Sequence, residues 1–182
     1  MSIEITISKI NRELISAFAL LDSWFDHHEK FLFEKTSDRW SPAEILEHVM
    51  LTNHHLLMLI EKGSERARNI ALQNDLTEAL KDYQLENPAL EEVGNPEFFS
   101  WDRPLHMKPS GSKPLNEIRK ELRAQLYRCL CQLDLLCQGE GIAYRIAMSV
   151  NGLGKLDVYQ YIYFLTLHVK RHLVQLEKCE NV

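Results

Sequence analysis

The chain contains 182 residues, of which 45% are apolar and 26% charged, and its formal net charge is −5. These values are typical of a globular protein with a proper core, and we expect a single domain over residues 1–182. The negative charge and the lack of a basic stripe argue against nucleic acid as a partner.

The first predicted element is a helix over residues 7–35. The N-terminus before it lacks the charged start, apolar stretch and cleavage site of a secretory signal peptide. Apolar residues then recur at a spacing of 3.6, which indicates an amphipathic helix with one buried face. His28 lies on the same face and is expected at the core edge or the surface, not as a metal ligand. The apolar stripe consists of Ile10, Leu14, Ala17, Phe18, Leu21, Phe25 and Leu32.

The second predicted helix has the clearest start in the sequence. Ser41 is a good N-cap, Pro42 suits the first helical position, and Glu44 completes a capping box. We expect the helix to run to about residue 62, where Gly63 can end it. Its inward stripe is formed by Ile45, His48, Val49, Thr52, Leu56 and Leu59.

Histidines occur on two sides of this helix. His48 lies on the apolar face, where a neutral imidazole needs either a hydrogen-bond partner or a metal ion. His54 and His55 lie mostly off that face and are expected to be solvated. They also interrupt the most apolar segment of the chain, VMLTNHHLLMLI, which is too short and too polar to span a bilayer. We therefore predict no membrane association.

The amino-acid composition changes after the second predicted helix. Residues 64–83 read as a weaker helical piece, and residues 87–114 contain five of the six prolines. An irregular connection of this length is often functional. Its aromatic stretch FFSWDRPLHMKP is interpreted either as a lid over a pocket or as a patch packed on the helices. His106 in this stretch is a weaker candidate for a metal ligand or proton shuttle.

The third long helix is predicted from about residue 112 or 114 to residue 138, before Gly139 and Gly141. Its buried side is expected to consist of Leu115, Ile118, Leu122, Leu126, Cys129 and Leu133. The four cysteines, three of them in this helix, are Cys129, Cys131, Cys137 and Cys179. The C-x-C-x5-C spacing is not the paired C-x2-C of structural zinc sites, so we interpret them as reduced thiols of a cytoplasmic protein.

The last helix is predicted from about residue 156 to residue 178, after a turn in NGLGKLD. Its apolar seam is Val158, Ile162, Leu165, Val169, Leu173 and Leu176. The sequence contains no convincing strand pattern. We therefore predict an all-α protein, a four-helix bundle with a long irregular connection before the third long helix.

Two histidines stand four residues apart in the last helix, within LHVKRHLVQLE. His168 and His172 therefore project from one face and can reach the same ion. Val169 occupies the place of the glutamate in the H-E-x-x-H motif, so the chain is not a metalloprotease of that type. An H-x-x-x-H pair alone is a weak signal. The inward His48 on another helix would complete three ligands, which is the open pattern of catalytic metals.

Two segments together resemble the DinB-like superfamily. One is RWSPAEILEHVM, which carries Trp40, Ser41, Glu44 and His48 in a W-S-x-x-E-x-x-x-H pattern. The other is GKLDVYQYIYFLTLHVKRHLVQLE, which carries an H-x-x-x-H pair followed by a glutamine, with an arginine before the second histidine. These residues are His168, Arg171, His172 and Gln175. The resemblance implies a four-helix bundle that binds zinc or nickel through His48, His168 and His172. It also implies a homodimer.

Characterised relatives in that superfamily include enzymes that use low-molecular-weight thiols. The resemblance thus implies a divalent-metal-dependent S-transferase acting on a small electrophile, with catalytic residues other than the ligands unknown. A metal-dependent hydrolase and a non-enzymatic metal- or ligand-binding bundle are the alternatives. Glu44 and Gln175 are candidates to orient the ligands through hydrogen bonds. Helix capping is the preferred role for Glu44, and ordinary helix packing is an equally good role for Gln175.

Overall fold

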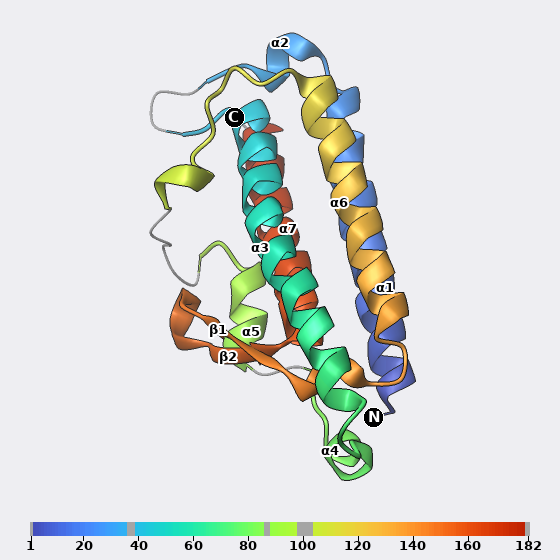
Figure 1. The fold of residues 1–182 in the computed structure, drawn as a ribbon. Coiled ribbons are helices and arrows are strands. Elements are labelled where there is room, and N and C mark those ends of the chain that lie inside the picture. The colour runs from blue at the N-terminus through green and yellow to red at the C-terminus, as the bar shows by residue number, and fades with distance from the viewer. Residues whose placement is uncertain (1, 36–38, 86–87, 98–103, 181–182) are drawn as a thin grey trace.

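The computed structural model describes residues 2–35, 39–85, 88–97 and 104–180. Four long helices make up its body, as predicted (Figure 1): α1 (Ile3–Ser23), α3 (Pro42–Ala71), α6 (Leu115–Leu135) and α7 (Val158–Glu180). The predicted all-α class is confirmed. Among the helices of the described residues, none is both long and apolar enough to cross a membrane.

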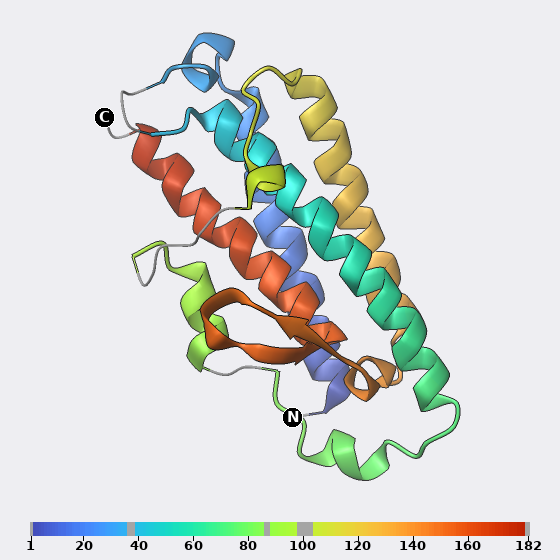
Figure 2. The same cartoon turned by 60° about the vertical axis from the view of Figure 1, so that its left-hand side comes forward.

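The four long helices close into a bundle. Helix α1 packs against α7, α7 against α3, α3 against α6, and α6 against α1. Figures 1 and 2 show that α1 and α7 run in one direction along the bundle, whereas α3 and α6 run in the other. The connection between α3 and α6 must therefore return along the whole bundle. We call residues 72–114 the crossover segment.

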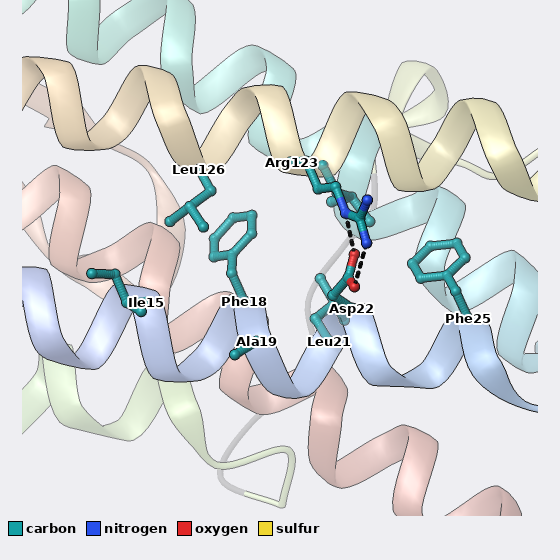
Figure 3. Close-up of a pocket in the computed structure, with 9 residues that line it drawn as sticks. Ile15, Phe18, Ala19, Leu21, Asp22, Phe25, Arg123 and Leu126 are labelled. Carbon is teal, nitrogen blue, oxygen red and sulfur yellow. Dashed lines mark hydrogen bonds and ion pairs between the residues drawn. The ribbon is translucent and has the colours of Figure 1, made fainter.

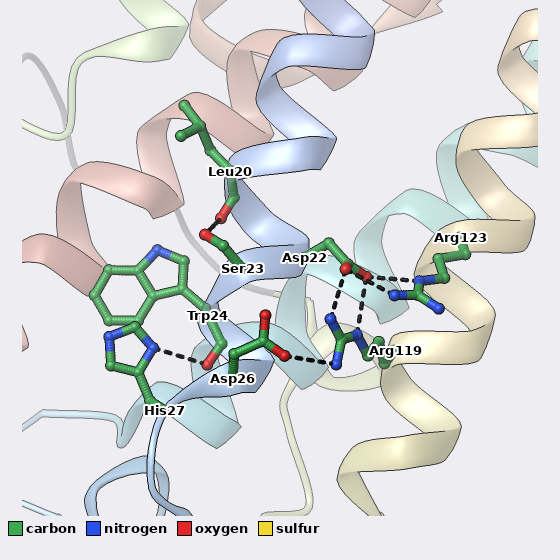
Figure 4. Close-up of polar contacts among 8 residues, drawn as sticks. All are labelled: Leu20, Asp22, Ser23, Trp24, Asp26, His27, Arg119 and Arg123. Carbon is green, nitrogen blue, oxygen red and sulfur yellow. Dashed lines mark hydrogen bonds and ion pairs between the residues drawn. The ribbon is translucent and has the colours of Figure 1, made fainter.

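The first helix ends earlier than predicted. Helix α1 stops at Ser23, and a 3-10 turn, η1 (Trp24–Asp26), and a short helix, α2 (Glu29–Leu32), follow it. His27 adopts an extended backbone, its ring stacks on Trp24 at 4.7 Å, and its Nδ1 hydrogen-bonds the Trp24 carbonyl (Figure 4). These contacts between Trp24 and His27 hold the chain in the bend. The apolar spacing of the sequence continues through the bend and therefore does not reveal where the helix ends.

Helix α3 continues nine residues beyond the predicted end, to Ala71, and Gly63 lies in its interior. A Cβ at position 63 would lie 2.5 Å from Ile146 Cδ1 and 3.3 Å from Val158 Cγ2. The glycine is therefore a close-packing position, at which Ile146 of the following hairpin and the start of α7 approach α3. The prediction that it ends the helix was wrong because a glycine that permits close approach has the same sequence signal as one that ends a helix.

A small β-hairpin joins α6 to α7, contrary to the expectation of no strand. Strand β1 (Arg145–Met148) pairs antiparallel with β2 (Gly154–Asp157). Each strand has four residues, which is too short for an alternating pattern to stand out. The turn between them includes η5 (Val150–Gly152), and the positive φ of Gly152 and Gly154 explains why glycines occupy these positions.

The crossover segment is only partly irregular. It contains α4 (Thr77–Lys81), α5 (Pro88–Glu91) and the 3-10 turns η2 (Glu92–Gly94) and η3 (Leu105–Met107). Turn η2 packs against α7 and η3 packs against α3, across the outer side of the bundle (Figure 2). The aromatic residues that suggested a lid, Phe98, Phe99 and Trp101, lie outside the described residues.

The seam between α1 and α6 combines ion pairs with an apolar hollow. Asp22 accepts hydrogen bonds from both Arg119 and Arg123, and Asp26 accepts another from Arg119 (Figure 4). These guanidinium groups hold the pKa of the Asp22 carboxyl well below its usual range. Beside the ion pair of Asp22 and Arg123, Phe18 and Leu126 line a cavity of about 250 Å³ (Figure 3). No predicted metal ligand is among the residues that line it.

Candidate metal centre

The structure brings the three predicted histidines together from two helices. His48 comes from the second turn of α3, and His168 and His172 come from successive turns of α7. All three are buried, and one nitrogen of each lies within 4.8 Å of one nitrogen of the other two. Their ring centroids are 5.5, 4.8 and 4.5 Å apart. We call these residues the histidine triad.

Hydrogen bonds on the outer side of the triad select which nitrogen faces inward. His48 Nδ1 lies 2.7 Å from the Met107 carbonyl oxygen, and His172 Nδ1 lies 2.8 Å from Gln175 Oε1. Both partners are acceptors, so each Nδ1 carries the proton and donates. The Nε2 lone pairs of His48 and His172 are thereby left to accept a proton or bind an ion.

The two histidines of α7 face each other directly. His172 Nε2 lies 3.0 Å from His168 Nε2. Two nitrogens bound to one tetrahedral zinc ion at about 2.0–2.1 Å are about 3.4 Å apart, so only a small movement separates this geometry from shared ligation. The contact has the length of a hydrogen bond, and an ion bound to both rings would take its place.

Burial favours the neutral form of His168. His168 is fully buried, and burial, followed by the neighbouring His172, His48 and Arg171, lowers its pKa well below the usual histidine value. A neutral imidazole has the lone pair that a metal requires, whereas an imidazolium does not. The surroundings therefore keep His168 ready to bind a cation at neutral pH.

The start of α3 is built as the sequence predicted. Ser41 Oγ accepts from the Glu44 backbone N–H at 3.2 Å, and the Glu44 carboxylate accepts from the Ser41 N–H at 2.9 Å. The second Glu44 oxygen binds Lys35. The capping box is confirmed, and a role for Glu44 toward His48 stays a prediction. Trp40 packs its ring 4.9 Å from that of His48.

Glu47 is a buried residue beside the triad that sequence reasoning missed. It is buried next to His48, and its carboxylate accepts hydrogen bonds from Ser110 Oγ at 2.8 Å and the Gly111 N–H at 2.9 Å. These bonds tie the end of the crossover segment to α3, close to the Met107 carbonyl that orients His48. Only the adjacency of Glu47 to His48 could have suggested it from the sequence.

A second set of hydrogen bonds ties the crossover segment to α7, the other helix of the triad. Arg171, next to His172, donates to the carbonyl oxygens of Asn95 at 2.5 Å and Pro96 at 3.3 Å. The segment is thus bound at residues adjacent to the triad on both α3 and α7. The motif pointed to Arg171, but its backbone partners lie far away in the sequence.

The other candidate histidines do not join the triad. His28 and His54 are exposed, as expected, whereas His55 is half-buried. His106 is exposed on η3, and its ring lies beside that of His55. The four cysteines are free thiols in the structure.

The donor set fits a borderline divalent metal. Within the described residues, the group that could hold an ion contains three histidines and neither a cysteine nor a carboxylate. Imidazole nitrogens suit zinc, nickel, copper and iron, whereas magnesium and calcium prefer oxygen. Three protein ligands also leave coordination positions for water or substrate, unlike the four that usually close a structural zinc site.

Comparison with known proteins agrees with this architecture. The sequence model described as the DinB superfamily matches residues 16–176, a range that includes all three histidines of the triad. No curated protein and no solved structure matched the chain. Since the match covers most of the sequence, the chain belongs to the DinB superfamily.

Proposed function

We propose that this protein is a divalent-metal-dependent enzyme that transfers a small thiol to an electrophile. The observation that carries the proposal is the convergence of three buried histidines, with the Nδ1 atoms of two of them committed to Met107 and Gln175. A site of three neutral imidazoles leaves the full charge of a divalent ion uncompensated. Such an ion stabilises a bound thiolate, the nucleophile of thiol transfer.

The residues of the chain would divide the work in a simple way. His48, His168 and His172 hold the ion, and Met107 and Gln175 fix the orientation of two of the rings. In the transfer, the thiol sulfur forms a carbon–sulfur bond as a carbon–halide bond of the electrophile breaks. The halide leaves with the bonding electrons and the thiol proton passes to solvent.

The remaining attributes of the proposal rest on the resemblance and on the cysteine pattern. They are zinc or nickel as the ion, a low-molecular-weight thiol as one substrate, a homodimer, and a cytoplasmic location. The four free cysteines are consistent with a reducing compartment.

The first test is metal content and thiol-dependent turnover of untagged protein. We expect about one zinc or nickel ion per chain in the triad, lost in His48→Ala, His168→Ala and His172→Ala. We also expect turnover of a haloaromatic substrate that requires both thiol and metal. His28→Ala, at an exposed histidine, is the matched control and should keep both properties.

The alternatives give different outcomes. Hydrolysis of an ester without any thiol would support a metal-dependent hydrolase, because a metal-bound water can also act as nucleophile. Metal binding without either turnover would support a non-enzymatic bundle. Unchanged metal content in the His168→Ala variant would overturn the site itself.

A further inference from the structure

A second pair of histidines lies outside the triad, where η3 meets α3. The ring centroids of His55 and His106 are 4.4 Å apart, and the ring planes form an angle of 71°. In the triad, the closest pair of rings has nearly the same geometry, 4.5 Å and 71°. The two rings are therefore in contact, which is close enough for two imidazoles to be turned toward one ion.

We propose that His55 and His106 form a second site for a divalent transition-metal cation. The two residues are far apart in the sequence and come from different elements, so helical periodicity does not explain their meeting. Turn η3 is held on α3 by the hydrogen bond between His48 and the Met107 carbonyl, and this brings His106 to His55. The inference goes beyond the proposed function and does not depend on it.

The surroundings suit weak, exchangeable binding. His55 is half-buried and His106 is exposed, so an incoming ion keeps access to water. Burial, together with the neighbouring His106 and His54, lowers the pKa of His55, which favours its neutral, ligating form. Within the described residues, only the triad brings three ligand atoms within 4.8 Å of one another. The second site thus has two protein ligands and takes water in its other positions.

The second site is separate from the triad. His48 and His55 are seven residues apart on α3, which corresponds to about 10 Å along the helix axis. Two-metal catalytic sites hold their ions about 3.5–4 Å apart, so the two sites do not form a dinuclear centre. An ion at the second site would instead link α3 to η3, the turn whose carbonyl orients His48. It would act as a clamp on that turn.

The test is equilibrium dialysis of untagged protein against Zn²⁺, with metal analysis of the protein. We expect two affinity classes in the unchanged protein, with about one ion in each. His55→Asn and His106→Asn should each lose the weaker class and keep the tighter one. A double variant, His168→Ala with His172→Ala, should lose only the tighter class. His28→Asn, an exposed histidine away from both sites, should keep both, and Mg²⁺ should occupy neither.

Backbone hydrogen exchange provides a second readout that does not depend on activity. In the His168→Ala/His172→Ala variant, saturating Zn²⁺ should slow exchange in residues 104–108, and His55→Asn should abolish this protection. A single class of zinc in the unchanged protein that is retained in His55→Asn would overturn the proposal. So would a weaker class that persists when both His55 and His106 are replaced by Asn, or one that disappears in His28→Asn.

Discussion

The replacement of Glu47 by Ala tests whether the crossover segment orients the triad. The change removes two hydrogen bonds to a buried carboxylate, from Ser110 Oγ and the Gly111 N–H. Hydrogen bonds to charged groups contribute about 1.5–3 kcal/mol each. Ser110 is exposed and Gly111 half-buried, so water partly replaces the lost acceptor. We therefore expect the docked segment to lose about 2 kcal/mol in total.

That loss sets an upper limit for the effect on the metal. Each 1.4 kcal/mol corresponds to a factor of ten, so about 2 kcal/mol transferred completely to the orientation of His48 would weaken metal affinity about 30-fold. Outer hydrogen-bond partners of metal ligands generally affect affinity by about 10–100-fold, which covers the same range. We expect Glu47→Ala to fall between about 10-fold and 30-fold weaker zinc binding.

The assay is competition for zinc between the protein and a chromophoric chelator. Glu61→Ala is the matched control, because Glu61 is a carboxylate on the same helix that binds Arg128 through two hydrogen bonds away from the triad. The control should keep the affinity of the unchanged protein. Equal zinc affinity in Glu47→Ala and the unchanged protein, with both folded by circular dichroism, would refute the reasoning.

Three further predictions concern α7. Gln175→Leu removes the acceptor for His172 Nδ1 and should weaken zinc binding about 10-fold or more in the chelator assay, whereas a purely packing role would leave affinity unchanged. Arg171→Ala releases two backbone carbonyls of the crossover segment and should speed hydrogen exchange in residues 92–97, with the long helices unaffected. Asp157, the buried N-cap of α7, has its pKa raised to about 6, chiefly by burial. The folded protein therefore favours the protonated carboxyl, and the free energy of unfolding should fall by at most about 3 kcal/mol as the pH rises from about 4 to 6. Asp157→Asn should remove this dependence in denaturant titrations. An unchanged pH profile in that variant would contradict the assignment.

The histidine triad and the long helices could be predicted because their signals are local. Helical spacing places His168 and His172 on one face, and the capping box fixes where α3 begins, hence where His48 projects. Only the family resemblance predicted that these two helices are neighbours, since neither motif alone indicates it. Apolar spacing likewise identified the buried seam of α7, each member of which lies in the core.

The partners of the ligands could not be predicted, because they are backbone atoms or depend on distant contacts. The Met107 carbonyl that orients His48 has no side-chain signature. Glu47 looks like an ordinary charged helical residue until Ser110 and Gly111 are placed beside it. Gly63 was misread for the same reason, since only the position of Ile146 shows that it permits close packing.

The directions of the helices explain why the crossover segment reaches the histidine triad. Helices α3 and α6 run the same way, so the chain must return along α3, a distance of about 45 Å for its 30 residues. The return ends where α3 begins, and that is also where His48 meets the histidines of α7. The segment therefore reaches the triad by topology, and it is bound there through Glu47 and Arg171. Because the same segment supplies the carbonyl that orients His48, a change in its sequence near Met107 also acts on the histidine triad.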